Sequence, residues 1–286
     1  MVAGAQTGGA RIARRTTWRT PLRRAGRLAG SRPVSILIYV AVMAGIVLAA
    51  LNGAAAMGYN WQWYRIPQYF YDVTEEGGFV LGEIPWGLVG TIGLSTSAFA
   101  LAVVIGLVVA LLRLSDLVVG RAVAIGFLEL IRNLPLLVLL YVSYYVFGPI
   151  FGLDRWAASV ACLAVYHGAL ISEIFRAGIN AVPRGQREAA KSIGMSTAQA
   201  YRDIILPQAF RFMLPPMTGE VVNMIKSSAI VSVIAVAELT TVGRDIISET
   251  YLSFEIWFTI AAVYMAVTLI ISAFATWLEK RHDVTD

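Results

Sequence analysis

The sequence has little charge and almost no cysteine. Only 14% of its 286 residues are Asp, Glu, Lys or Arg, whereas a soluble globular domain carries about 25%. Hydrophobic residues make up 58% of the chain. The single cysteine, Cys162, excludes an internal disulfide and is expected to be a small apolar packing residue. This composition is typical of a membrane protein.

The sequence also lacks the patterns that mark catalytic, nucleotide and metal sites. Its two histidines, His167 and His282, are far apart and do not have metal-ligand spacing. No G-x-x-x-x-G-K-[ST] phosphate-binding loop occurs, so the chain does not bind ATP by that device. No nucleophile–base arrangement or paired aspartates are found. We therefore expect no enzyme activity, no cofactor and no metal.

Long apolar runs predict an all-α integral membrane protein with six spans. A helix needs about 20 apolar residues to cross about 30 Å of hydrocarbon. Three runs carry no charge at all, and three others contain a few ionisable residues. The predicted spans are residues 34–56, 86–112, 122–147, a fourth over 156–171, 212–236 and 256–278.

The basic residues predict how the spans are oriented. Lys and Arg collect in cytoplasmic loops. Most of the 23 lie before the first span, between the second and third, between the fourth and fifth, and after the sixth. The opposite loops contain only Arg65, Arg155 and Arg244. We expect both termini in the cytoplasm, with the net charge of +5 facing anionic membrane lipid rather than nucleic acid.

Two regions flank the first span. Residues 1–33 form a basic tail, expected to be disordered or to lie on the membrane surface. The apolar run at 34–56 is longer than the roughly 7–15 residues of a signal-peptide core, which favours a retained span. Residues 57–85 form an aromatic-rich outer loop, for which interfacial anchoring is favoured over a role in substrate entry.

The most polar internal segment, residues 183–207, joins the fourth and fifth spans. Residues 186–193 favour a short helix, and Gly194 is suited to a left-handed stop after it. A capping box, S/T-x-x-E/Q, begins at Ser196 and starts a second helix, which is expected to end at Pro207. This helix–glycine–helix segment is too short to span. It either docks another protein or lies flat on lipid headgroups.

Ionisable residues inside apolar runs are costly and need partners. Glu129 and Arg132 are spaced i,i+3, as are Glu173 and Arg176, so each pair is expected to form an ion pair near the cytoplasmic end. These pairs are expected to anchor helix ends rather than to contact a ligand.

A polar strip is predicted on the fifth span. Glu220, Asn223 and Lys226 follow one another in steps of three and cover about 120° of a helix. Such a strip faces either a translocation path or an internal salt-bridge network. Small and hydroxylated residues on the second span favour close helix packing, with pore lining as the alternative. The candidate path residues are Thr91, Ser95, Glu220, Asn223, Lys226, Ser227 and Ser228.

Several motifs together identify a family resemblance. "EAAKSIG" followed by "ILPQA" resembles the EAA loop of permease subunits in ATP-binding-cassette importers. "LELIRNLPLL" and "LPPMTGEVVNMIKSSAIVSVIAVAEL" are similar to segments of the polar amino-acid (histidine, glutamine, glutamate) permeases. The resemblance extends from about residue 85 to the C-terminus. One difference is "KSSAI" at 226–230, where the family usually has Lys-Asp-Thr/Ser-Ser-Leu.

The resemblance implies a type I importer fold, with residues 86–278 as the permease core and 279–286 as a cytoplasmic tail. It implies a coupling helix that docks into a cleft of an ATPase subunit. The expected partners are two ATPase subunits, a second permease (identical or different) and an extracytoplasmic solute-binding protein, all at the inner membrane. The residues expected to couple to the ATPase are Gly185, Glu188, Ala189, Ala190, Ile193 and Gly194.

Three alternatives remain at this stage. The importer could carry another small solute. A self-sufficient secondary transporter or channel would need its own ion-coupling site or an inverted repeat, and the predicted spans contain no aspartate. An intramembrane enzyme would need a catalytic pair, which the sequence lacks.

Overall fold

The computed structural model describes residues 32–73 and 78–282. Expectations for the basic tail therefore fall almost entirely outside the described residues. The chain divides into two units, Met1–Trp61 and Gln62–Asp286. We describe each unit by itself.

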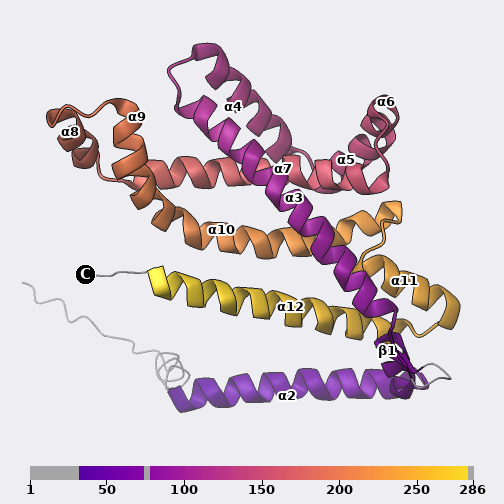
Figure 1. The fold of residues 1–286 in the computed structure, drawn as a ribbon. Coiled ribbons are helices and arrows are strands. Elements are labelled where there is room, and N and C mark those ends of the chain that lie inside the picture. The colour runs from indigo at the N-terminus through magenta and orange to yellow at the C-terminus, as the bar shows by residue number, and fades with distance from the viewer. Residues whose placement is uncertain (1–31, 74–77, 283–286) are drawn as a thin grey trace, which may run out of the picture. The chain divides into compact units, whose positions relative to one another are not determined.

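The first unit contains one long helix, α2 (Arg32–Ala56), shown in Figure 1. It has the length and composition of a membrane span, and its most apolar stretch has no residue buried against other parts of the chain. Apolar residues occur on every side of it. Such a helix is stable when lipid surrounds it, which agrees with the predicted first span.

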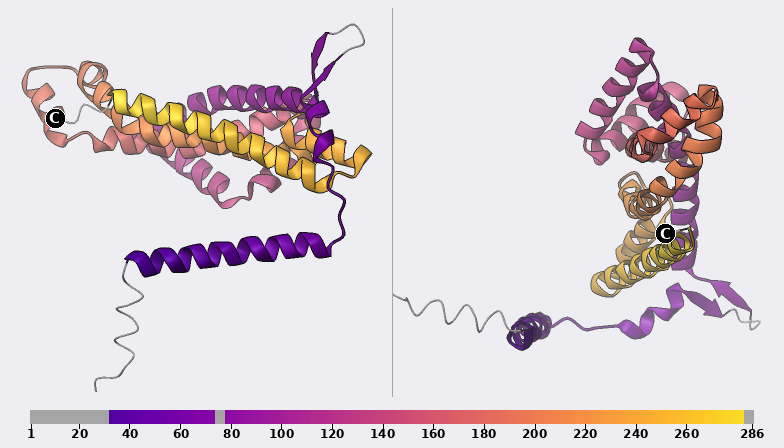
Figure 2. Two further views of the ribbon diagram at one scale, coloured as in Figure 1. Left: turned by 90° about the horizontal axis from the view of Figure 1, so that it is seen from below. Right: turned by 90° about the vertical axis from the view of Figure 1, so that its left-hand side faces the viewer.

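The second unit is a helical bundle with a small hairpin at one end. In Figure 2 (left) the hairpin of β1 and β2 lies at one end of the bundle, and α8 and α9 lie at the other. The hairpin strands are antiparallel, with Tyr71 opposite Leu81. The elements in chain order are η1 (Trp63–Arg65), η2 (Pro67–Tyr69), β1 (Tyr71–Val73), β2 (Phe79–Leu81), α3 (Glu83–Leu114), α4 (Val118–Asn133), α5 (Leu136–Tyr141), η3 (Val142–Phe147), α6 (Gly148–Phe151), α7 (Arg155–Ala181), α8 (Arg184–Ser192), α9 (Thr197–Ala200), η4 (Tyr201–Ile205), α10 (Leu206–Ser228), η5 (Ala229–Ile234), α11 (Leu239–Thr250) and α12 (Ser253–His282).

Among the described residues, four helices are long and apolar enough to cross a membrane: α2, α3, α7 and α12. Two bent helix pairs raise the number to six if each pair is one span. The all-α membrane fold is therefore confirmed. The aromatic loop at 57–85 is more structured than the sequence suggested, since it holds both η1 and η2 and the two strands.

The third predicted span is wrong as a single helix. The segment Val118–Asn133 meets Leu136–Phe151 at an angle of 108°. Leu134 and Pro135 both have extended backbone there, with ψ of 135° at each. Proline disfavours helical backbone in the residue before it, so the helix ends before Pro135 and the chain bends sharply there.

The fifth span shows the opposite result. We expected Pro207 to end the second helix of the polar segment, but the helix continues over Thr197–Ile234 and includes Pro207, Pro215 and Pro216. Pro207 lies in the first turn of α10, directly after the π-helical turn η4. Prolines are tolerated in membrane helices because neighbouring groups and local π adjustments satisfy the backbone groups that they free. The polar segment is thus continuous with the fifth span.

The core of the second unit lies between α3 and α7, which approach each other through glycines. A Cβ atom on Gly106 would lie 2.7 Å from Ile171, and one on Gly168 would lie 2.9 Å from Ile105. Small residues at such positions let membrane helices pack backbone to backbone. Cys162 is buried in the same core, as expected.

A second close contact joins α3 to the connection before α11. A Cβ atom on Gly90 would lie 2.3 Å from the carbonyl oxygen of Ala237. We expect Gly90→Ala to lower the free energy of unfolding by about 1–3 kcal/mol, since overpacking forces the backbone to shift. Thermal unfolding in detergent measures the change. The matched control is Gly126→Ala on α4, where no described atom lies within 4 Å of the added Cβ; equal unfolding temperatures for the two variants would contradict the prediction.

Candidate functional site

The polar segment folds as a helical elbow, defined as residues 184–205. In Figure 1 it projects at one end of the bundle as α8 and α9. Gly194 has φ of +80°, the predicted left-handed stop after α8. The predicted capping box is also present, because Ser196 N–H donates to Gln199 Oε1 (2.9 Å) and Gln199 N–H donates to Ser196 Oγ (3.3 Å). The helix–glycine–helix prediction is confirmed as geometry.

One side of the elbow is held to the bundle by contacts with α7, and the other side is exposed. Arg187 donates from Nη2 to the carbonyl of Ile179 at the end of α7 (3.0 Å) and lies 5.8 Å above the ring of Tyr201. Ala190 is buried, whereas Ile193 is 75% exposed. The other predicted coupling residues, Gly185, Glu188, Ala189 and Gly194, are exposed as well. The elbow therefore presents a small apolar surface edged with charge.

A carboxylate at the elbow's side of α7 gathers arginines from three helices. Glu173 pairs with Arg176 (2.9 Å), as predicted, and also with Arg113 of α3. The predicted Glu129–Arg132 pair is wrong, because Arg132 Nη1 lies 3.8 Å from Glu173 instead. Glu129 Oε2 instead accepts a hydrogen bond from the side-chain amide of Asn133, one turn further along α4 (3.3 Å). Glu173 thus ties α3, α4 and α7 together.

A buried polar contact joins α7 to α10. His167 Nδ1 lies 2.5 Å from Glu220 Oε1, and the two side chains are 1% and 8% exposed. His167 Nε2 is also buried and has no hydrogen-bond partner among the described residues. His167 was not among the functional residues predicted from the sequence. The signal that was available is the cost of a polar side chain in an apolar span, which implies a partner.

The predicted polar strip on α10 divides into two faces. Glu220 points inward to His167, while Asn223 and Lys226 are exposed. Asn223 Nδ2 still reaches Glu220 Oε2 at 3.4 Å. Within residues 78–282, Lys226 makes no ion pair that the structure records. Ser227 is partly exposed, whereas Ser228 is buried and donates to the carbonyl of its own helix.

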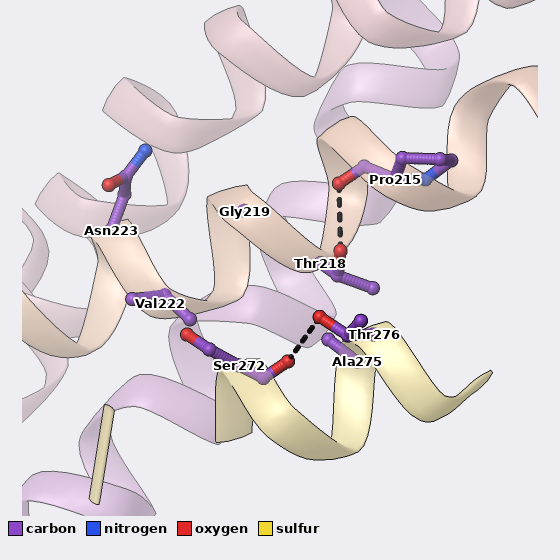
Figure 3. Close-up of a pocket in the computed structure, with 8 residues that line it drawn as sticks. All are labelled: Pro215, Thr218, Gly219, Val222, Asn223, Ser272, Ala275 and Thr276. Atoms are coloured by element: carbon purple, nitrogen blue, oxygen red, sulfur yellow. Dashed lines mark hydrogen bonds between the residues drawn. The ribbon is translucent and has the colours of Figure 1, made fainter. Parts of the chain in front are cut away.

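A hollow of about 310 Å³ lies between α10 and α12, beside this exposed face. In Figure 3 Asn223 points away from the hydroxyl groups of α12. The threonine hydroxyls bond within their own helices: Thr218 of α10 donates to the carbonyl oxygen of Pro215 (2.7 Å), and Thr276 of α12 donates to that of Ser272 (3.0 Å). The hollow is large enough for a small solute. Its lining residues are Pro215, Thr218, Gly219, Val222, Asn223, Ser272, Ala275 and Thr276.

The two candidate residues of α3 lie in the interior. Thr91 is fully buried, and its Oγ1 accepts a hydrogen bond from the backbone N–H of Leu239 (3.1 Å). Ser95 is buried and its hydroxyl has no partner in the described part of the chain. Both positions fit the helix-packing alternative. No group of three or more His, Cys, Asp or Glu residues suited to a metal occurs among the residues described here.

Comparison with known proteins gives consistent matches. Residues 102–284 match the family model described as binding-protein-dependent transport system inner membrane component. A probable glutamine ABC transporter permease of Bacillus subtilis (strain 168) is 35% identical over 197 residues, which is 68% of this chain and 91% of that protein. A nopaline transport system permease of Agrobacterium fabrum is 34% identical, covering 67% of this chain and 86% of that protein.

Solved structures agree with these sequence matches. A crystal structure of an amino acid ABC transporter with histidines is 42% identical, with a TM-score of 0.64 over 68% of this chain and 92% of that one. An inward-facing methionine ABC transporter is only 18% identical, with a TM-score of 0.61 over 68% of this chain and 94% of that one, and supports the fold alone. The family match leaves α2 and the aromatic loop outside it.

Proposed function

From the premise that this chain belongs to the family of binding-protein-dependent transport system inner membrane components, we propose that it moves a polar amino acid across the cytoplasmic membrane. Transport proceeds by alternating access, driven by partner ATPases. Amino-acid permeases among the relatives support the substrate class. The proposed assembly contains a second permease, two ATPase subunits and an extracytoplasmic solute-binding protein, and the chain's own termini lie in the cytoplasm.

The elbow is the observation that carries this proposal. It offers exposed apolar groups at Ala189 and Ile193, beside the charge of Glu188, beyond the end of the spanning helices. A surface of this kind fits a cleft on a partner better than a flat lipid surface, since Gly194 turns α8 and α9 against each other. In our proposal ATP-driven closure of the ATPases moves the elbows of the two permeases together.

Force on the elbow reaches the spans through two helices. α7 enters the elbow and α10 leaves it, and the His167–Glu220 contact joins these helices inside the bundle. Glu173 connects α7 further to α3 and α4. Elements tied in this way move as one body, so displacement at the docking surface opens or closes a path elsewhere.

We propose that the exposed face of α10 lines that path. Asn223 and Lys226 lie on it, with Ser227 partly exposed beside them. A lysine in a membrane span needs water, protein or a ligand next to it. Thr91, Ser95, Glu220 and Ser228 are buried, and we assign them a supporting role.

The decisive experiment is purification of the chain with its native partners, followed by reconstitution into vesicles. We expect an ATPase to co-elute, and we expect amino-acid uptake only when ATP and the solute-binding protein are both supplied. Vesicles lacking ATP are the control. Uptake by this chain alone under an imposed ion gradient would instead identify a secondary transporter.

A further inference from the structure

Two arginines from distant helices meet on one turn at the end of the bundle opposite the elbow. η5 ends in a turn in which Ala235 has φ of +52° and donates its N–H to Ser232 O (3.0 Å). Arg244 of α11 donates from Nη1 to Ser232 O (2.9 Å), and Arg155 at the start of α7 donates to Ala235 O (3.1 Å). The two guanidinium groups therefore donate hydrogen bonds to backbone carbonyls that are three residues apart.

The acids next to these cations in the sequence are Asp154 and Asp245, and neither forms an ion pair with them in the described part of the chain. Neither arginine forms an ion pair among the described residues, and both side chains are exposed. The adjacent Asp154 caps α7 by accepting from Ala157 N–H (2.7 Å). Glu238 is buried and accepts from Thr240, Thr241 and Tyr264. Each guanidinium has five N–H donors, so donors remain after the carbonyl contact.

Lys226 adds a third cation to this region. It is exposed on α10 three residues before η5 begins. The described part of α10 carries only one acid, Glu220, and this residue is buried against His167. The exposed face of α10 that leads from η5 therefore carries the positive charge of Lys226 and no exposed acid of its own helix.

The turn that holds the cations is itself fixed in place. Its continuation packs on α3, where the carbonyl of Ala237 lies directly against Gly90. Leu239 N–H donates to Thr91 Oγ1 (3.1 Å). Groups held by a rigid, hydrogen-bonded support bind a ligand with less loss of entropy.

We propose that Arg155, Lys226 and Arg244 form an anion-receptive turn, which selects amino acids that carry a side-chain carboxylate over neutral or basic ones. The inference rests on the proposed function, since it assigns the substrate class of the same path. Guanidinium and ammonium groups bind carboxylates by charge-assisted hydrogen bonds, and they repel a cationic side chain. Lys226 lies in the last turn of α10, inside the predicted fifth span and not in an outer loop, which favours a small solute over an acidic protein surface.

The test uses the permease–ATPase complex without the solute-binding protein, so that the permease's own selectivity is measured. Glutamate, glutamine and arginine are titrated into the complex by calorimetry. We expect glutamate to bind at least about tenfold more tightly than the other two. Lys226→Gln is expected to remove most of that preference, weakening glutamate binding about tenfold while leaving glutamine unchanged.

Arg121→Gln is the matched control, because it removes an exposed cation at the α3–α4 connection. It should leave glutamate binding unchanged. The inference would be overturned if glutamine or arginine bound as tightly as glutamate, or if no binding of glutamate could be measured. It would also be overturned if glutamate binding were unchanged in Lys226→Gln. A Lys226→Gln complex that loses affinity only for the solute-binding protein would overturn it too, because the turn would then be a protein-docking surface.

A parallel uptake assay tests the anion-receptive turn and the proposed transport function separately. ATP-dependent uptake of a neutral or basic amino acid, with acidic ones excluded, contradicts the anion-receptive turn but leaves the proposed function intact. Absence of any ATP-dependent uptake by the complete complex contradicts the proposed function itself.

Discussion

Gly194→Val is expected to reduce ATP-dependent uptake by at least about tenfold while membrane insertion stays intact. Gly194 has φ of +80°, and no described atom outside its own neighbourhood would lie within 4 Å of a Cβ atom added there. The effect is therefore one of backbone strain and not of crowding. Left-handed backbone costs an ordinary L-residue about 1–2 kcal/mol, and β-branching makes it worse. Relief of that strain turns α8 away from α9 and spoils the docking surface.

Two measurements test this prediction. The first is uptake into vesicles, and the second is the stimulation of ATP hydrolysis by substrate-loaded binding protein. The matched control is Gly126→Ala in α4, outside the elbow, where the backbone is helical and the added Cβ meets no described atom beyond its own helix. Alanine favours a helix by about 0.5–1 kcal/mol over glycine, so this variant should transport normally. Undiminished uptake by Gly194→Val would show that the elbow's shape does not matter for coupling.

His167→Leu is expected to lower the free energy of unfolding by about 3 kcal/mol, because it leaves the Glu220 carboxylate buried without its closest partner. The two atoms lie 2.5 Å apart, and Asn223 at 3.4 Å is a poor replacement. Because the contact joins α7 to α10, we also expect less uptake per ATP hydrolysed. Thermal unfolding in detergent, together with a coupled uptake and ATPase assay, measures both effects.

The double variant His167→Leu with Glu220→Leu is the informative control. Replacing both members of a buried polar pair with apolar groups is close to neutral for stability, whereas removing one is not. The double variant should therefore recover most of the lost stability. If it recovers stability but not coupling, the pair has a mechanical role in addition to a structural one. A single variant as stable as the parent chain would refute the prediction.

Features of the elbow that depend on near neighbours were predictable from the sequence. Gly194 and the Ser196–Gln199 capping box act within one or two turns of backbone, and both occur as expected. Prolines were less predictable. Pro135 broke a helix, while Pro215 and Pro216 lie inside one. Membrane helices tolerate proline where neighbouring groups or local π adjustments satisfy the freed backbone groups, and the sequence alone does not show where that happens.

Side-chain partners across the bundle were the hardest to predict. Arg132 contacts Glu173 rather than Glu129, although the i,i+3 spacing favoured the latter. Glu220 lies on the predicted polar strip of α10, yet it turns inward to His167, 53 positions away. A helical spacing gives the angle between two side chains on one helix. It does not tell which neighbouring helix lies at that angle.

By itself the sequence determined the membrane class, the apolar helices and the polar elbow, because hydrophobic transfer and local backbone preferences act within one segment. Only the tertiary structure decided that Glu173 joins three helices, that His167 meets Glu220, and that Arg155 and Arg244 share one turn. These contacts join residues on different helices. They depend on how glycines such as Gly106 and Gly168 let the helices approach, and no single segment contains that information.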